Sequence, residues 1–347
     1  MSDQRSDLRH VQLINWARGF CGVHRPFRQA VSCSALSVHL KSELANYFAL
    51  AALSRSGSAN PAHVKQAYGE VFRIRVLLEQ VVARAVERAL GTTLDRVRAC
   101  LGKGTFFGSS KKQGTSLRMP LSTCTPTSLC KGACYAHDVL DATPFAVVRG
   151  ALNGWVASCY EAGDSHLRAE IMVLLRRHSA RAISNARSEL VALPADFVRR
   201  PFIRFSHVGE VTKYPRFANA LAALIKHESN GQVDCIVYTR HRNAARLDPD
   251  LWVINFTLDP ASLDRKAWAP AHARIVFSAF NGITSNLAEV NFLEHHRHIH
   301  MARSSGDGRI CPATKPETKM RTCDACRCNR CFVQPLPRHA PLTAPIG

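Results

Sequence analysis

The chain has 347 residues, 46% of them hydrophobic, and a formal net charge of +20. This length suits one large domain, or one domain with a smaller companion, and the hydrophobic content is ordinary for a globular protein. No apolar run reaches the roughly 18–20 residues that span a membrane, and the polar N-terminus lacks a signal-peptide core. The sequence therefore predicts a cytoplasmic protein without a membrane partner.

The excess of positive charge favours a polyanionic partner, of which nucleic acid is the first candidate. An arginine-rich genome composition would give the same excess without a binding site. The thirteen cysteines carry more information. In a reducing compartment they favour metal ligation over a disulfide framework.

Residues 1–101 are predicted to form a helical region. Apolar residues recur at helical spacing over 35–53 and again over 61–91, and a short helix is expected over 92–101. The stretch 102–114 is rich in Gly, Ser and Lys, and it lacks the complete phosphate-loop pattern. We expect it to be a hinge or a basic loop.

The stretch 115–305 alternates short apolar runs with helical segments, which is typical of a parallel α/β sheet. Helices are expected over about 144–161, 165–192 and 216–227. The expected strands are 117–121, 202–206, 235–239, 251–256, 274–278 and 298–302. Six such units predict a partial (β/α)6 TIM-like barrel, which carries its site at the carboxyl ends of the strands.

A loop of unusual composition, Ser122–Asp138, follows the first expected strand. Its three cysteines, Cys124, Cys130 and Cys134, have the spacing C-x5-C-x3-C and are separated by Pro, Gly and small polar residues. Three thiols on one irregular loop can converge on a metal ion or an iron–sulfur cluster, and they leave one coordination position open for chemistry. The alternative is three buried thiols without a ligand.

Several polar residues lie at the ends of later strands. Arg204 is in the expected strand 202–206, and His207, Gly209 and Glu210 follow it. Glu210 either faces the site or is a favourable acid at the start of a helix. The next two strands end in polar residues that either line a pocket or are solvated strand ends: Tyr238, Arg240, Asn255 and Asp259.

The cysteine loop and Val208-Gly209-Glu210 together resemble the radical S-adenosylmethionine superfamily, which binds a 4Fe-4S cluster through three cysteines after the first barrel strand. The resemblance is closest to the phage and plasmid "gene product 88" family, through CTPTSLCKGACYA, VGEVTKYPRF, VYTRHR and a late CPAT…C-x2-C segment. It covers residues 117 to 332. The superfamily spacing is C-x3-C-x2-C with an aromatic residue before the last cysteine, whereas here Tyr135 follows Cys134.

This resemblance implies particular roles. The three loop cysteines would hold the cluster, and its free iron would bind S-adenosylmethionine. Gly209 and Glu210 would hold the amino group of that cofactor, and Tyr135 and Arg204 are further cofactor-binding candidates. A redox enzyme of this type also needs an electron donor as a partner.

The segment 306–333 is a second cysteine region, and the Pro-rich residues 334–347 are predicted to be a disordered tail. The five cysteines of the segment 306–333 are one more than a tetrahedral metal site needs: Cys311, Cys323, Cys326, Cys328 and Cys331. They suit a zinc ion or a second iron–sulfur cluster equally. Among nearby histidines, the run 295–300 is either a metal site or a polar rim.

Two functions follow from these patterns. The first is an iron–sulfur enzyme of the radical type that acts on a large substrate, nucleic acid among the candidates. The second is a non-catalytic nucleic-acid-binding protein stabilised by zinc or a cluster. Hydrolase and dinucleotide-binding fingerprints are missing from the sequence.

Overall fold

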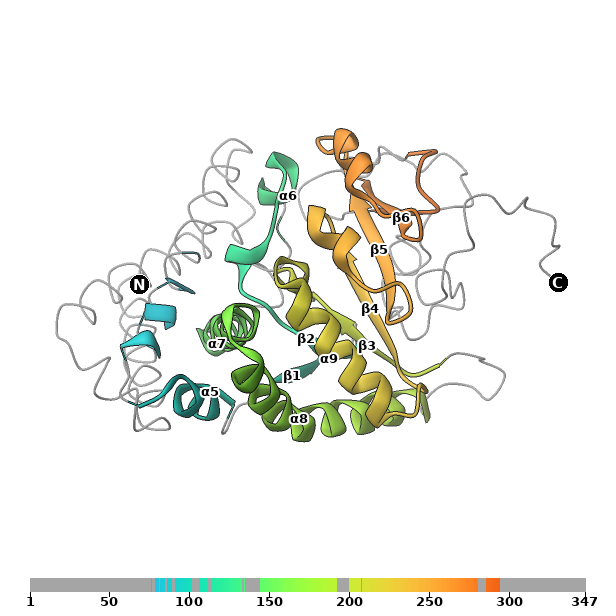
Figure 1. The fold of residues 1–347 in the computed structure, drawn as a ribbon. Helices are drawn as coiled ribbons and strands as arrows, with labels where there is room; N and C mark the ends of the chain where they lie inside the picture. Colours follow the sequence, from blue (N-terminus) through green and yellow to red (C-terminus); the bar gives the residue numbers. More distant parts are fainter. Residues whose placement is uncertain are drawn as a thin grey trace, which may run out of the picture. The chain divides into compact units, whose positions relative to one another are not determined.

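The computed structural model describes residues 76, 79–80, 82–84, 86–88, 91–101, 106–110, 114–132, 134, 144–191, 200–206, 208–279 and 285–293 (Figure 1). The helix predicted over 35–53, most of the stretch 61–91, the strand predicted over 298–302, the histidine run and everything from residue 306 onward lie outside them. The described residues form two compact units. One contains the residues up to Phe106, Arg118–His178 and Val208–Glu210, and the other contains Phe107–Leu117, Ser179–His207 and the residues from Val211 onward.

The second unit contains a seven-stranded sheet in which the spatial order of the strands is their order in the chain. Its strands are β1 (Phe107–Ser110), β2 (Gly114–Leu117), β3 (Phe202–Phe205), β4 (Asp234–Thr239), β5 (Trp252–Leu258), β6 (Arg274–Ala279) and β7 (Val290–Leu293). β1 and β2 form an antiparallel hairpin, and all later pairs are parallel. Among the described strands the sheet is open, with β1 and β7 at its edges.

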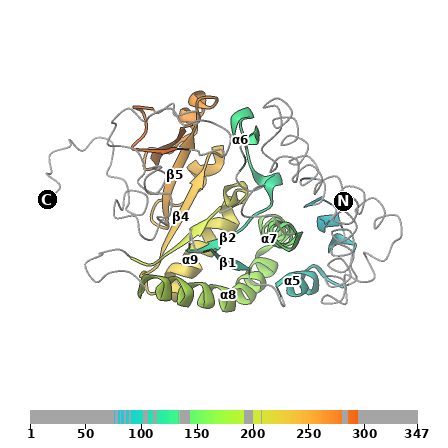
Figure 2. The ribbon, with the colours of Figure 1, turned by 180° about the vertical axis from the view of Figure 1, so that it is seen from behind.

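The central parallel strands β4, β5 and β6 are rich in apolar residues, as parallel strands covered on both faces require. One face carries Trp252, which is fully buried and packs edge-on against Phe205 at 4.6 Å between ring centroids. This face is covered by α9 (Pro215–Glu228), whose Asn219 accepts a hydrogen bond from the indole of Trp252. Figures 1 and 2 show α9 and the strands from opposite sides.

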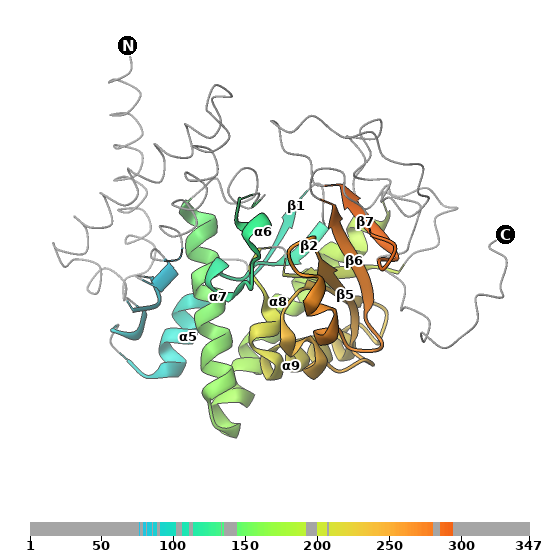
Figure 3. The same ribbon diagram turned by 90° about the horizontal axis from the view of Figure 1, so that it is seen from above.

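The opposite face of the sheet is concave. Its apolar cluster extends from Phe202 on β3 to Val290 on β7. Tyr238 on β4 and Phe292 on β7 are three strand spacings apart, about 14 Å on a flat sheet, yet their ring centroids are 5.9 Å apart. The sheet therefore curves toward this face, and Figure 3 shows the parallel strands β5, β6 and β7 side by side.

The first unit is mainly helical in its described part, with α5 (Thr93–Leu101), α6 (Ser128–Gly132) and α7 (Pro144–Ala162). α8 (Ser165–Val191) begins in this unit and ends in the other. α5 starts with a capping box, because the Asp95 amide donates to Thr92 Oγ1 and the Thr92 amide donates to Asp95 Oδ2. A buried layer of Val97, Leu101, Trp155 and Ile171 belongs to this unit.

The sequence predicted most of these elements. The helices expected over 92–101, 144–161, 165–192 and 216–227 are confirmed within one or two residues, as are the central strands β3 to β6. Two predictions were wrong. The stretch 107–110 is a strand rather than a loop, because it pairs with β2, and only Leu117 of the expected strand 117–121 is extended in the sheet. The chain leaves the sheet at Arg118 and turns into the short helix η1 (Leu121–Thr123).

Candidate functional site

The cysteine loop begins with a base, Arg118–Thr123, that directly follows β2 in the chain. The Met119 amide donates a 2.7 Å hydrogen bond to the Val208 carbonyl. Beside it Gly209 has a φ of +72°, and a Cβ atom there would lie 2.4 Å from the Pro120 carbonyl oxygen. The segment after β3 therefore contacts the loop base backbone to backbone, and only glycine fits at this contact.

A second contact to the loop base comes from α7. Two glycines one turn apart bring this helix against the chain: a Cβ on Gly154 would lie 2.5 Å from Pro120 Cγ, and one on Gly150 would lie 3.2 Å from the Met119 carbonyl oxygen. Between them the buried Asn153 amide donates to the Arg118 and Phe106 carbonyls at 2.8 and 3.0 Å. α7 thus holds the entry of the loop in place.

Glu79 supplies the third contact. Its Oε1 accepts from the Leu121 amide at 2.7 Å, and its Oε2 accepts from the Ser122 amide at 2.8 Å. The residue is 3% exposed. Sequence reasoning missed this role, although a signal was present. Glu79 lies three residues from Val76 and seven from Val86, so it is an acid on a stripe predicted to be buried.

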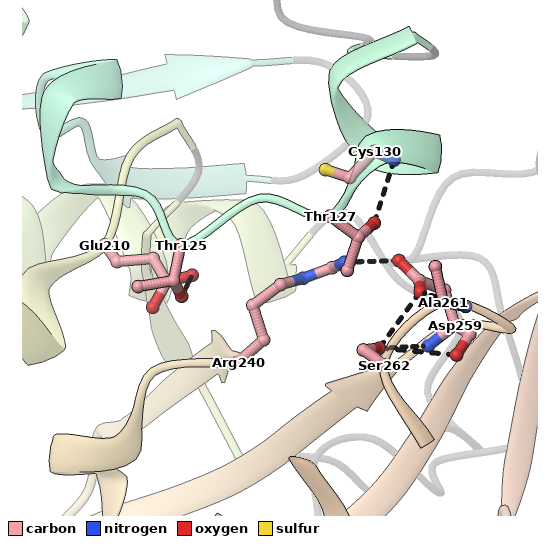
Figure 4. A network of polar contacts seen from close by, with 8 residues as sticks. All are labelled: Thr125, Thr127, Cys130, Glu210, Arg240, Asp259, Ala261 and Ser262. Atoms are coloured by element: carbon pink, nitrogen blue, oxygen red, sulfur yellow. Dashed lines mark hydrogen bonds and ion pairs between the residues drawn. The ribbon is translucent and has the colours of Figure 1, made fainter. Parts of the chain in front are cut away.

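Glu210 lies against the cysteine loop. Its amide donates to Thr123 Oγ1 at 2.7 Å, and Thr125 Oγ1 donates to its Oε1 at 3.3 Å. Figure 4 shows Glu210 beside Thr125, with Thr127 and Cys130 further along the same loop. The residue is 6% exposed. Glu210 also directly precedes the short helix η3 (Val211–Lys213), so its place in the chain fits the predicted alternative, an acid at the start of a helix, as well.

The three loop cysteines lie in one neighbourhood of the first unit. Cys124 follows η1, Cys130 is in α6 and Cys134 follows α6. Cys124 and Cys134 both pack against the buried pair Leu121 and Val208, and none of the three forms a disulfide with another described cysteine. Thr127 Oγ1 accepts from the Cys130 amide at 3.0 Å, which shapes the turn that carries this cysteine.

The electrostatics of this neighbourhood are unfavourable to an isolated thiolate. Burial raises the pKa of the Cys124 thiol well above its usual value, and the charges of Glu210, Cys134, Cys130 and Glu79 raise it further. Each of these groups is neutral or negative, so a bound cation would offset the repulsion among them.

The donors fit a thiolate-bound metal in kind but do not form a finished ligand set. Within the part of the chain that the structure describes, no group of three or more Cys, His, Asp or Glu side chains is arranged to hold a metal ion. The remaining predicted site residues lie outside the described part: Tyr135, His207, Cys311, Cys323, Cys326, Cys328 and Cys331.

In the second unit, strand register places three of the predicted polar residues on the concave face: Arg204, Tyr238 and Asn255. Tyr238 is paired directly with Asn255. The Arg204 guanidinium lies 4.2 Å from the centroid of the Tyr238 ring, a cation–π contact. The structure thus brings these residues onto one surface instead of leaving them as separate solvated strand ends.

Two further arginines of the second unit make polar contacts near the strand ends. Arg240 Nη1 is 2.6 Å from Oδ2 of the fully buried Asp259, whose Oδ1 accepts from the Ala261 amide (Figure 4). Arg274, which sequence reasoning missed, is also buried and reaches Asn255 at 3.5 Å and Glu289 at 3.2 Å. The concave face therefore carries Arg204 and Arg274, and the ion pair of Arg240 and Asp259 lies directly after β4 and β5.

Comparison of the chain with models of protein families, with curated proteins and with solved structures finds no match. Among the described residues, no helix combines the length and apolar character needed to cross a bilayer.

Proposed function

We propose that this protein is an iron–sulfur enzyme of radical S-adenosylmethionine type. The observation that carries the proposal is the contact between Glu210 and the cysteine loop, made by Thr123 and Thr125, beside the thiol of Cys124. A buried acid beside the first cysteine of a three-cysteine loop suits both the binding of a cluster and the binding of a cofactor amino group. The open, curved parallel sheet supports the finer fold proposal, a partial (β/α)6 barrel.

In this proposal the protein binds and orients the reactants. Cys124, Cys130 and Cys134 would hold a 4Fe-4S cluster, and Glu210 would accept hydrogen bonds from the amino group of S-adenosylmethionine. When bound, the cluster would supply the electron that cleaves a carbon–sulfur bond of that cofactor, and an external electron donor would replace it. The rigid loop base would keep Cys124 and Glu210 at a fixed separation.

The concave face of the sheet supports an anionic substrate. Arg204 and Arg274 lie on this face, Arg240 directly follows β4, and the chain as a whole carries a charge of +20. Stacked aromatic and guanidinium groups are features that bind single-stranded nucleic acid or nucleotides. We propose a large, phosphate-bearing substrate of this kind and a reducing, cytoplasmic setting.

The test is iron and sulfide analysis of protein purified without oxygen. We expect brown wild-type protein with the visible absorbance of an iron–sulfur cluster. Cys130→Ala should lose the share of iron and sulfide that belongs to the loop. Cys235→Ala is the matched control, because Cys235 is buried in β4 away from the loop sequence. Equal iron in wild type and Cys130→Ala would contradict the proposal.

Cofactor binding needs its own measurement. Equilibrium dialysis with S-adenosylmethionine should show binding to the wild type and at least about tenfold weaker binding to Glu210→Gln, as loss of a charge-assisted hydrogen bond predicts. The same cluster content in both proteins is required for this comparison. Equal binding of S-adenosylmethionine by the wild type and Glu210→Gln would show that Glu210 does not hold this cofactor.

A second candidate is a zinc-stabilised nucleic-acid-binding protein without catalysis. It is favoured by the net charge of +20 and by the stacked Arg204 and Tyr238 side chains of the concave face. A colourless protein that contains only zinc and binds DNA or RNA in a salt-dependent manner would support this candidate over the first.

A further inference from the structure

Glu79 stands out among the residues that the proposed function does not yet use. It belongs to the N-terminal helical region, outside the stretch that carries the family resemblance. Both of its carboxylate oxygens are engaged, one by the Leu121 amide and the other by the Ser122 amide. Because each carboxylate oxygen accepts a hydrogen bond from a backbone amide, Glu79 is better placed to fix the backbone than to ligate a metal.

The two amides that Glu79 binds are the first two of η1. The start of a helical turn leaves amides without partners in the turn, and these need an acceptor when they are buried. The residue before η1 is Pro120, which makes no side-chain cap. Glu79 therefore takes the place of a local cap, from 42 residues away in the sequence.

η1 ends directly at Cys124, whose amide donates to the Leu121 carbonyl at 2.9 Å. The same turn contains Thr123, which accepts from the Glu210 amide. A shift of η1 would thus displace the first cysteine and the contact to Glu210 together. Charge alone would make Glu79 unfavourable beside Cys124, because it raises the pKa of that thiol.

We propose that Glu79 is the positioning residue of the cysteine loop: by holding the Leu121 and Ser122 amides, it sets where Cys124 presents its thiol to a bound metal. The proposal rests on the function proposed above. It implies that Glu79, which precedes the stretch with the family resemblance, belongs to the metal site.

Glu79→Gln tests this proposal with little change in shape. The amide keeps one acceptor oxygen but turns a donor toward the second backbone amide. Loss of a residue that orients a metal ligand typically weakens metal binding about 10–100-fold. We expect at least a tenfold weaker apparent affinity of the loop for iron during anaerobic reconstitution with iron and sulfide.

Any iron bound by the C-terminal cysteines is common to all of these variants. A double variant separates that iron from the iron bound by the loop. Glu79→Gln with Cys130→Ala should bind no less iron than Cys130→Ala alone, because both changes affect the same loop. If Cys130→Ala leaves the iron content unchanged, the proposed function fails. If Cys130→Ala lowers it and Glu79→Gln does not, the proposed function stands and the role of Glu79 is overturned.

Glu189→Gln is the matched control for general destabilisation. Glu189 accepts from the amide and hydroxyl of Thr115 at 2.8 and 3.0 Å, a comparable two-oxygen contact to β2 in the second unit. Its substitution should lower the thermal stability and leave the iron content unchanged. An equal loss of iron in Glu189→Gln and Glu79→Gln would overturn the proposal.

Glu79→Asp carries the test if Glu79→Gln does not fold. It keeps both oxygens and the charge but withdraws them by one methylene group, so iron affinity should fall between those of the wild type and Cys130→Ala. Affinity equal to that of the wild type in Glu79→Asp would count against positioning by this carboxylate.

Discussion

The base of the cysteine loop and the parallel sheet are held in different ways. At the loop base, side chains distant in sequence bind backbone groups, as Glu79 and Asn153 do, and glycine permits a backbone contact. In the sheet, bulky buried side chains such as Trp252 and Phe256 fill the space between strands and helix. A few polar and glycine positions thus specify the loop, whereas apolar volume specifies the sheet.

Among substitutions that test this difference, Trp252→Ala should cause the largest loss of unfolding free energy. The side chain is fully buried, and removing it leaves a cavity that costs about 3–5 kcal/mol of unfolding free energy. Trp268→Ala is the control, because that indole is 39% exposed and should change stability by less than about 0.5 kcal/mol. Chemical denaturation of both variants measures the difference, and similar values would show that volume does not stabilise the sheet.

Gly209→Ala tests the backbone contact at the loop base. Alanine is strained at a φ of +72°, and its Cβ would meet backbone atoms, so we expect a loss of about 3 kcal/mol. Gly231 has almost the same φ, +69°, but open space around it, and Gly231→Ala should cost only about 1–2 kcal/mol. Equal losses in thermal denaturation would mean that the close approach to Pro120 is not needed.

Arg240→Met isolates the buried ion pair of the sheet. It leaves the Asp259 carboxylate without its 2.6 Å partner, although that carboxylate keeps its bond from the Ala261 amide. We therefore expect a loss of about 2 kcal/mol, below the range for a fully stranded charge. Arg242→Met removes an exposed neighbouring arginine and should be close to neutral. Denaturation midpoints that coincide would contradict the importance of the pair.

The smallest effect concerns pH. Burial lowers the pKa of His272 from 6.5, and its Nε2 has no hydrogen-bond partner among the described residues. The unfolded chain therefore takes up a proton first as the pH falls, so this residue reduces stability below about pH 6.5. His272→Gln should make the melting temperature fall less between pH 7 and pH 5, whereas His227→Gln, at an exposed position, should not. A parallel decline in all three proteins would refute this assignment.

The sequence predicted the sheet better than the loop. β-branched and aromatic runs such as 235–239 and 274–278 identify buried strands locally, and Pro215 marks the start of α9. β1 was missed because Gly-Ser-Ser in a basic context looks like a loop, and only its pairing with β2 makes it a strand. The alternation of strands and helices predicted an α/β fold, and the described strands form an open, mostly parallel sheet.

The candidate site was predicted through its cysteines and Glu210, because these residue types are informative without neighbours. The contacts that hold these residues in place could not be predicted from the sequence. Glu79 and Asn153 act across 42 and 35 residues of sequence, and no local pattern pairs an acid or an amide with a particular backbone group so far away. Only the position of Glu79 on an apolar stripe hinted at a buried role.

The order of strands in the sheet, which repeats their order in the chain, has a consequence for biosynthesis. From β3 onward each strand pairs with the one made just before it, so its partner is already present when it leaves the ribosome. Such a sheet can grow by addition at one edge, with few long-range loops to close. We expect the segment from β3 to β6 to assemble during translation, while β2 waits for β3 across the long stretch that carries α7 and α8.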